Sequence, residues 1–138
     1  MLIQFWGVRG SLPTPITPQQ IQSKIMAAIQ RATPEDLQSE DSRAKFVSNL
    51  PSWIFGTTGG NTPCVEIKSD NTEIILDAGT GIRLLGKSQE LPENNKYNLL
   101  FSHFHWDHIQ GLPFFDPIYN PDTTINFFSP VENSKEIL

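Results

Sequence analysis

The side chains best suited to chemistry lie in one short stretch, residues 102–108. All three histidines of the chain fall within it, together with one aspartate: His103, His105, Asp107 and His108. On extended backbone, His103 and His105 project to the same side, and a turn within the motif brings the last two groups round from a second direction. A mixed set of imidazole and carboxylate groups suits a hydrolytic metal centre. The spacing therefore predicts that these four side chains bind metal.

A purely structural interpretation of the same stretch is a polar loop whose histidines bond to backbone groups. A single histidine would favour that interpretation. Three histidines and an aspartate, placed directly after the buried apolar run Asn98-Leu99-Leu100-Phe101, favour the metal site instead. A strand that ends at Phe101 would give the loop a rigid base.

The rest of the chain predicts the strands that position this loop. Apolar runs or alternating patterns bounded by turn residues predict strands at residues 2–6, 64–68, 72–77, 98–101 and 123–128. In the second of these, Val65 and Ile67 alternate with polar neighbours, as in a half-buried strand. The apolar run of 72–77 predicts burial on both faces, and Asp70-Asn71 before it predicts a hairpin turn. Ile82, Leu85 and Gly86 predict a short helix and its cap.

Residues 17–50 predict a helical insertion between these strands. Thr17-Pro18 and Thr33-Pro34 each place a capping hydroxyl before a proline, which is a helix start signal. A narrow apolar stripe follows the first start at i, i+4 and i+8: Ile21, Ile25 and Ile29. If exposed, this stripe would serve as a dimer face or a lid. A further capping box at Ser129-Pro130-Val131-Glu132 predicts a helix at the end of the chain.

The metal motif, together with Leu76-Asp77-Ala78-Gly79 before it, resembles the metallo-β-lactamase fold superfamily of hydrolases. Three further segments resemble a branch related to ribonuclease Z and to cyclic-phosphate phosphodiesterases: residues 5–11, 59–66 and 77–83. The resemblance covers most of the chain outside 17–50. It implies an α+β fold of the αββα sandwich type, of which residues 1–138 are the N-terminal part.

The resemblance also implies roles for individual residues. His103 and His105 would hold a first metal, and Asp107, also the catalytic residue, and His108 a second. Asp77 matches an acidic family position that supports the site, and Asn61 would support it by donating to a phosphate; a plain turn explains Asn61 equally well. Family members add two histidines and an aspartate from their C-terminal half. This sequence has no histidine after His108, so water or Cys64 would supply the remaining ligands of the first metal.

The function implied is hydrolysis of a phosphodiester by a metal-bound hydroxide in a dinuclear site. The cofactor would be zinc, two ions per complete site, with manganese as the other option. The substrate would be a small phosphate ester or an RNA end. Two alternatives stay open: a thioester or other carbonyl hydrolase on the same fold, and a truncated, non-catalytic domain that needs a partner or a missing C-terminal half.

Composition limits the classes of partner and the compartments that are compatible with this chain. The 138 residues carry 10 Lys plus Arg against 15 Asp plus Glu, a net charge of -5, which excludes a broad nucleic-acid-binding surface. No apolar run approaches the length of a membrane span, and the N-terminus does not have the pattern of a signal peptide. A single cysteine, Cys64, excludes an internal disulfide. We therefore expect a cytoplasmic protein, with a homodimer as an option.

Overall fold

The computed structural model describes residues 1–69, 72–88 and 95–130. The chain divides into two compact units. Met1–Thr14 and Thr58–Leu138 form one unit, called the sheet unit below. Pro15–Thr57 form the other, the helical unit. The chain is thus a mixed α+β protein in which a helical segment interrupts a sheet between its first and second strands.

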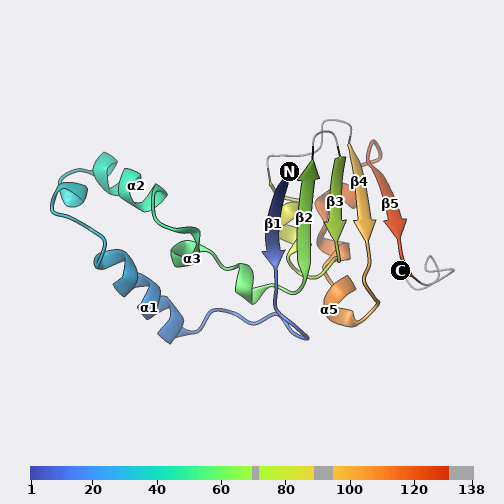
Figure 1. Ribbon diagram of the computed structural model, residues 1–138, viewed down its shortest axis with the longest axis horizontal. Coiled ribbons are helices and arrows are strands. Elements are labelled where there is room, and N and C mark those ends of the chain that lie inside the picture. The colour runs from blue at the N-terminus through green and yellow to red at the C-terminus, as the bar shows by residue number, and fades with distance from the viewer. Residues whose placement is uncertain (70–71, 89–94, 131–138) are drawn as a thin grey trace. The chain divides into compact units, whose positions relative to one another are not determined.

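The sheet unit is built on five strands in sequential order (Figure 1). They are β1 (Leu2–Gly7), β2 (Cys64–Ser69), β3 (Thr72–Leu76), β4 (Lys96–Leu100) and β5 (Thr124–Phe128). β2 pairs antiparallel with both β1 and β3, whereas β4 pairs parallel with both β3 and β5. Four strands, all except β2, therefore end at the same edge of the sheet. The strands expected from the sequence are all present.

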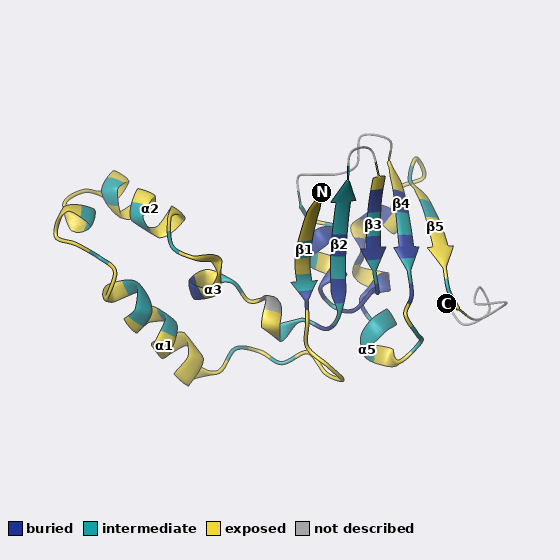
Figure 2. Ribbon diagram, in the orientation of Figure 1, coloured by how far each residue is buried: buried dark blue, intermediate teal, exposed yellow. Residues whose placement is uncertain are grey.

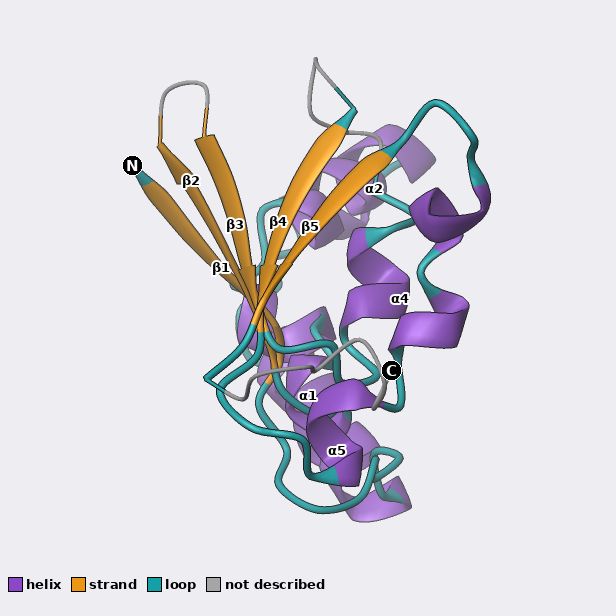
Figure 3. Ribbon diagram, turned by 90° about the vertical axis from the view of Figure 1, so that its right-hand side faces the viewer, coloured by secondary structure: helices purple, strands orange, loops and turns teal. Residues whose placement is uncertain are grey.

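Short helices connect the strands, and some of them cover one face of the sheet (Figure 3). They are η2 (Thr58–Gly60), α4 (Ile82–Leu85), α5 (Trp106–Ile109), η3 (Leu112–Phe114) and η4 (Asp116–Tyr119). The helix and cap expected at 82–86 are confirmed, since Gly86 is the C-cap of α4. Tyr97 of β4 meets Phe115 edge-to-face, with ring centroids 5.1 Å apart. This covered face holds the apolar core of the unit.

Burial alternates along the strands, which marks the covered face (Figure 2). One row across the sheet consists of Gln4, Glu66, Ile75, Leu99 and Phe127. Ile75 and Leu99 are fully buried, and Glu66 is 1% exposed. The half-buried pattern of β2 is present, but its buried positions are Cys64 and Glu66 rather than the apolar residues between them.

The other face of the sheet is also apolar, and no described element of the sheet unit covers it (Figure 3). Its central row is Phe5, Val65, Leu76, Leu100 and Phe128. Phe5 and Phe128, at the two ends of this row, are 56% and 50% exposed. The expectation that β3 is buried on both faces is wrong for the described chain, because Ile74 and Leu76 stay half-buried where Ile75 is fully buried.

The helical unit contains α1 (Pro18–Ile29), η1 (Glu35–Leu37), α2 (Glu40–Ser48) and α3 (Ser52–Phe55). The start predicted at Thr17 is confirmed, because both bonds of its capping box are present. The start predicted at Thr33 is wrong for the longer helix. The Asp36 carboxylate accepts hydrogen bonds from the Thr33 amide and hydroxyl, and only a single 3-10 turn, η1, follows. The helix α2 begins instead after Ser39, which forms a capping box with Ser42.

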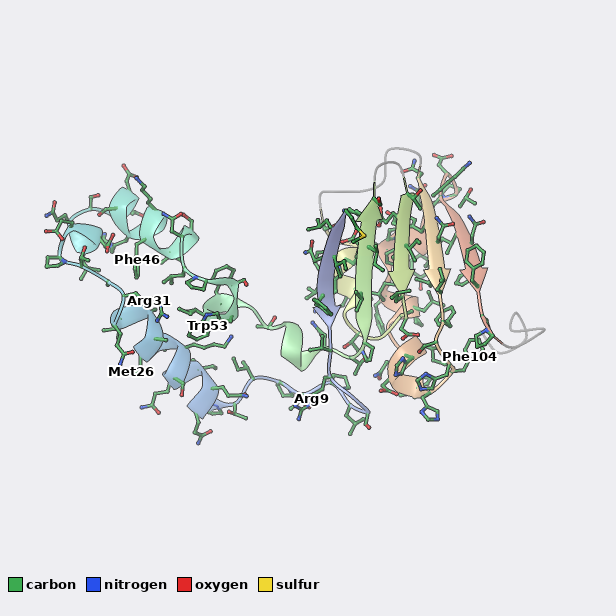
Figure 4. All side chains as sticks on the ribbon, viewed as in Figure 1. Arg9, Met26, Arg31, Phe46, Trp53 and Phe104 are labelled. Carbon is green, nitrogen blue, oxygen red and sulfur yellow. The ribbon has the colours of Figure 1, made fainter. Side chains whose placement is uncertain are left out.

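Two basic side chains of the helical unit contact α3 and the residue that follows it. Lys24 of α1 donates to the carbonyls of Trp53 and Gly56, and the Arg31 guanidinium lies 5.3 Å from the centre of the Trp53 ring (Figure 4). The apolar stripe of α1 is exposed at all three positions, Ile21, Ile25 and Ile29. A further short helix, α3, lies beyond the boundary of 50 expected for the insertion.

Two expectations fall on residues outside the described part. The hairpin turn at Asp70-Asn71 and the terminal helix from Val131 onward lie there. None of the described helices is both long enough and apolar enough to cross a membrane.

Candidate metal centre

The candidate centre forms where β3 and β4 end side by side. These parallel strands are in register at Leu76 and Leu100, so the residues that follow them meet at one edge. The amide of Asp77 donates to the Leu100 carbonyl at 2.9 Å. Asp77 and Ser102 are thereby brought together, although sequence separates them by a helix and a strand.

Asp77 accepts hydrogen bonds from both sides of this junction. The backbone amide of Ser102 donates to Oδ1 at 2.8 Å, and its hydroxyl donates to Oδ2 at 2.8 Å. Nδ1 of His108 lies 2.9 Å from Oδ2. Asp77 is only 7% exposed and has a positive φ of 61°. A non-glycine residue in this left-handed region is uncommon, and aspartate tolerates it better than most.

These contacts fix which ring nitrogen of each histidine carries a proton. A carboxylate only accepts, so Nδ1 of His108 is the donor to Asp77. The Ser102 hydroxyl has one proton, which Asp77 takes, so at 3.0 Å it accepts from Nδ1 of His103. In the neutral form of either ring, Nε2 is then the nitrogen that keeps its lone pair. Anchoring of the remote ring nitrogen in this way is typical of histidines that bind metal.

The three imidazole rings gather around His103. Its ring centroid lies 4.5 Å from that of His105 and 4.0 Å from that of His108. His105 is the N-cap of α5, and its side chain is exposed at the surface. The four-residue helix α5 places Asp107 and His108 one after the other, so the turn expected within the motif is a helical one.

Asp107 faces His108 and is held from a distant loop. Its Oδ2 lies 3.5 Å from Nε2 of His108 and accepts a hydrogen bond of 2.8 Å from the backbone amide of Ser11. This amide lowers the pKa of the Asp107 carboxyl, with smaller contributions from His108 and His105, against an opposing effect of desolvation. The group is therefore an ionised carboxylate at neutral pH, as a metal ligand requires.

The structure brings together all four expected ligands and Asp77. Among the described residues, however, no three His, Cys, Asp or Glu side chains are grouped so that they could hold a metal ion as they stand. Cys64 does not extend the set, since it is fully buried in the core. Its burial, with Glu66 and Asp77 nearby, raises the pKa of the thiol and keeps it protonated.

Asn61 lies in a neighbouring loop, and its described side-chain hydrogen bonds go to residues other than the four expected ligands. Its side-chain amide donates to the Trp6 carbonyl at 3.4 Å, and its Oδ1 accepts from the Thr80 hydroxyl at 3.3 Å. The side chain thus ties the loop before β2 to its neighbours. Its expected contact with a phosphate stays a prediction.

A set of reciprocal bonds fixes the loops around the centre. Thr80 donates its amide to the Thr62 hydroxyl at 2.7 Å, and Thr62 donates its amide to the Thr80 hydroxyl at 2.9 Å. Gln110, just after α5, donates to the same Thr62 hydroxyl at 3.3 Å. Gly111 packs so closely on the Gly79 carbonyl that no side chain would fit there. The histidine loop, residues 102–108, is therefore fixed to the two loops beside it.

Ser102 and Ser11 are the site residues that the sequence did not reveal. Ser102 had a local signal, because it stands between the end of a strand and the first histidine. Ser11 had none, because its contribution is a backbone amide and its partner Asp107 is far away in the sequence.

Comparison with known proteins finds no family model that matches the chain, and neither a curated protein nor a solved structure that is similar to it.

Proposed function

We propose that the chain is a metal-dependent hydrolase of the phosphodiesterase type, with a metallo-β-lactamase-like architecture. The observation that carries the proposal is the arrangement of His108. Its Nδ1 is held by Asp77, while its Nε2 faces Oδ2 of Asp107 at 3.5 Å. Two ligands of one tetrahedral zinc ion, with bonds of about 2.0–2.1 Å, lie about 3.3 Å apart. The spacing of these two atoms therefore suits a shared cation.

The donor set also fits the ions expected from the sequence. Neutral imidazoles and an ionised carboxylate suit zinc, and manganese accepts the same groups. His103 and His105 would hold one ion, and Asp107 and His108 the other. Such ions supply a hydroxide nucleophile near neutral pH and positive charge that stabilises the transition state.

The protein groups have separate tasks in this proposal. Asp77 keeps the proton of His108 on Nδ1 and fixes the plane of the ring. The Ser102 hydroxyl does the same for His103. Asp107 would hold its ion and orient the nucleophile. His105 is exposed, so a substrate could reach the centre from solvent.

The substrate class follows from charge and access. The net charge of -5 does not favour binding along a polynucleotide backbone. A small phosphate ester or the end of an RNA needs contact only at the centre itself. A thioester or other carbonyl substrate would use the same polarising ions.

One specific observation favours a second candidate, a domain without turnover that works with a partner or a further polypeptide layer. The uncovered face of the sheet carries the apolar row from Phe5 to Phe128. Parallel strands are normally covered on both faces. Covering this face would also supply the place from which further metal ligands could come.

Turnover of bis(p-nitrophenyl) phosphate with added Zn²⁺ or Mn²⁺ tests the proposal. We expect hydrolysis by the native chain and its loss in His105→Ala and Asp107→Ala. Asp116→Ala, an exposed acid at the start of η4, is the control and should keep full activity. Hydrolysis of a thioester alone would select the carbonyl hydrolase. Less than one equivalent of bound metal, without turnover of either ester, would select the non-catalytic domain.

A further inference from the structure

The loop that follows β1, residues 8–14, is fastened at both ends to the loop before β2. The amides of Val8 and Arg9 both donate to the Asn61 carbonyl, at 3.0 and 2.8 Å. At the other end, the Thr14 amide donates to the Gly60 carbonyl at 2.8 Å. We call residues 8–14 the strap.

The strap is also closed on itself. The Arg9 side chain donates from Nε to the Thr14 hydroxyl at 3.1 Å, and this hydroxyl donates to the Leu12 carbonyl at 3.3 Å. The loop before β2 needs glycine where it contacts the strap, because a Cβ on Gly60 would lie 2.6 Å from the Thr14 carbonyl oxygen. A Cβ on Gly7, where the strap begins, would collide with the Thr62 carbonyl. The strap is thus held in one conformation by bonds at both ends and across its middle.

The tip of the strap presents one backbone amide to the candidate centre. Ser11 has a positive φ of 67°, a conformation that non-glycine residues rarely adopt unless their surroundings impose it. In this conformation its N–H donates to Oδ2 of Asp107 at 2.8 Å. The same oxygen faces Nε2 of His108. The strap therefore contacts the carboxylate atom that lies toward the expected cation.

We propose that the strap is a positioning device for Asp107: the Ser11 amide holds the carboxylate in the orientation in which it binds metal. This inference rests on the proposed function, since Asp107 needs a fixed orientation only if it is a ligand. It assigns a task to two glycine-containing segments. Arg9-Gly10-Ser11 forms part of the strap, and Gly59-Gly60-Asn61 forms part of the loop before β2 to which the strap is bonded. Outer-shell hydrogen bonds to ligands typically change metal affinity 10- to 100-fold when lost.

The test is the affinity of the full chain for Zn²⁺, measured by competition with a fluorescent chelator. Ser11→Pro removes the N–H and, because proline cannot adopt the positive φ, also displaces the tip of the strap, whereas Ser11→Gly keeps the N–H and accepts the positive φ without strain. We expect Ser11→Pro to bind Zn²⁺ about 10- to 100-fold more weakly and Ser11→Gly to bind like the native chain. Native affinity in both variants would overturn the proposal. Equal weakening in both would also overturn it, because the amide is retained in one of them.

Asp107→Ala separates this inference from the proposed function. If Asp107→Ala binds Zn²⁺ as tightly as the native chain does, the metal proposal fails and the strap proposal fails with it. If Asp107→Ala weakens binding but Ser11→Pro does not, only the strap proposal fails.

A second measurement covers the case in which Ser11→Pro does not fold. In the metal-free chain, the Ser11 amide proton is followed by NMR in the native protein and in Asp107→Ala. A hydrogen bond to a carboxylate shifts an amide proton downfield, so loss of Asp107 should move the signal upfield. Gly60→Ala, which displaces the far anchor of the strap, should move it the same way and weaken Zn²⁺ binding. An unchanged signal in both variants would contradict the strap proposal.

Discussion

Nδ1 of His108 lies 2.9 Å from Oδ2 of Asp77, although the two residues follow different strands of the sheet. The parallel pairing of β3 and β4 creates this contact, because it places the ends of both strands at one edge. The Asp77 carboxylate, after β3, thus binds two residues of the segment after β4, Ser102 and His108. The relationship links the fold directly to the chemistry of the histidine motif.

Asp77→Asn tests the contact between Asp77 and His108. The carboxamide has nearly the same shape, but it is neutral and accepts through a single oxygen. We expect Zn²⁺ affinity to fall about 10- to 100-fold because the ring of His108 loses its fixed orientation and its basicity. Chelator competition measures the change, and Asp116→Asn is the matched control on an exposed turn. Native affinity in Asp77→Asn would show that the contact has no part in metal binding.

Glu73 makes stability depend on pH. Burial, followed by the proximity of Glu66, raises the pKa of Glu73 to about 7, while Lys68 acts in the opposite direction. The folded chain therefore keeps a proton that the unfolded chain releases near its ordinary value of 4.5. The resulting stability is complete below the unfolded pKa and is lost as pH rises through about 7.

We therefore expect the free energy of unfolding to fall by about 1–3 kcal/mol between about pH 4 and about pH 8, and Glu73→Gln to remove most of that dependence. Hydrogen exchange at the Ile75 and Leu99 amides reports the stability of the sheet itself. Glu35→Gln, an exposed site in the helical unit, is the control and should keep the native pH profile. An identical slope in Glu73→Gln would assign the pH dependence to other groups.

The close contact between Gly111 and Gly79 predicts a steep cost for any side chain at position 111. Gly111 donates its amide to the Ala78 carbonyl at 2.9 Å, and an added Cβ would collide with the carbonyl of Gly79. We expect Gly111→Ala to lower the free energy of unfolding by about 2 kcal/mol or more and, if the proposed metal centre is correct, to weaken Zn²⁺ binding as the histidine loop moves. Gly59→Ala is the matched control, because a Cβ there meets nothing within 4 Å.

The sequence was sufficient to predict all five strands and the convergence of the histidine motif. Apolar runs and turn residues carry that information locally. It was not sufficient to predict which face of β2 is buried. Both faces of the sheet are apolar, so alternation could not distinguish the buried Glu66 from an exposed acid. Glu66 accepts a hydrogen bond from the Trp6 indole and forms an ion pair with Lys68, at 3.0 Å each.

The helix start after Ser39 was missed for a related reason. Thr33-Pro34 carries the same local signal as Thr17-Pro18. The hydroxyl of Thr17 accepts from the amide of Gln20, whereas the hydroxyl of Thr33 donates to the Asp36 carboxylate, and η1, a single 3-10 turn, has no side-chain cap. The Ser11–Asp107 contact was beyond any local signal, because it depends on where the strap is fastened.

Leu99 and Leu100 test the two faces of the sheet with neighbouring residues. Leu99 is fully buried in the core, whereas Leu100 lies on the uncovered face. We expect Leu99→Thr to cost about 2–4 kcal/mol of unfolding free energy and Leu100→Thr to cost less than about 1 kcal/mol. Urea unfolding measures both. Equal costs would mean that a second layer covers Leu100 in solution.

The bond between the Thr14 amide and the Gly60 carbonyl has a topological consequence. The chain leaves the sheet unit and re-enters it at two points joined by this bond, so the helical unit is an insertion between them. We expect a tight turn in place of residues 15–57 to leave the pairing of β1 with β2 intact, because this bond joins the two ends of the insertion within the sheet unit. The same junction is the natural place to graft a foreign domain or a reporter onto this scaffold.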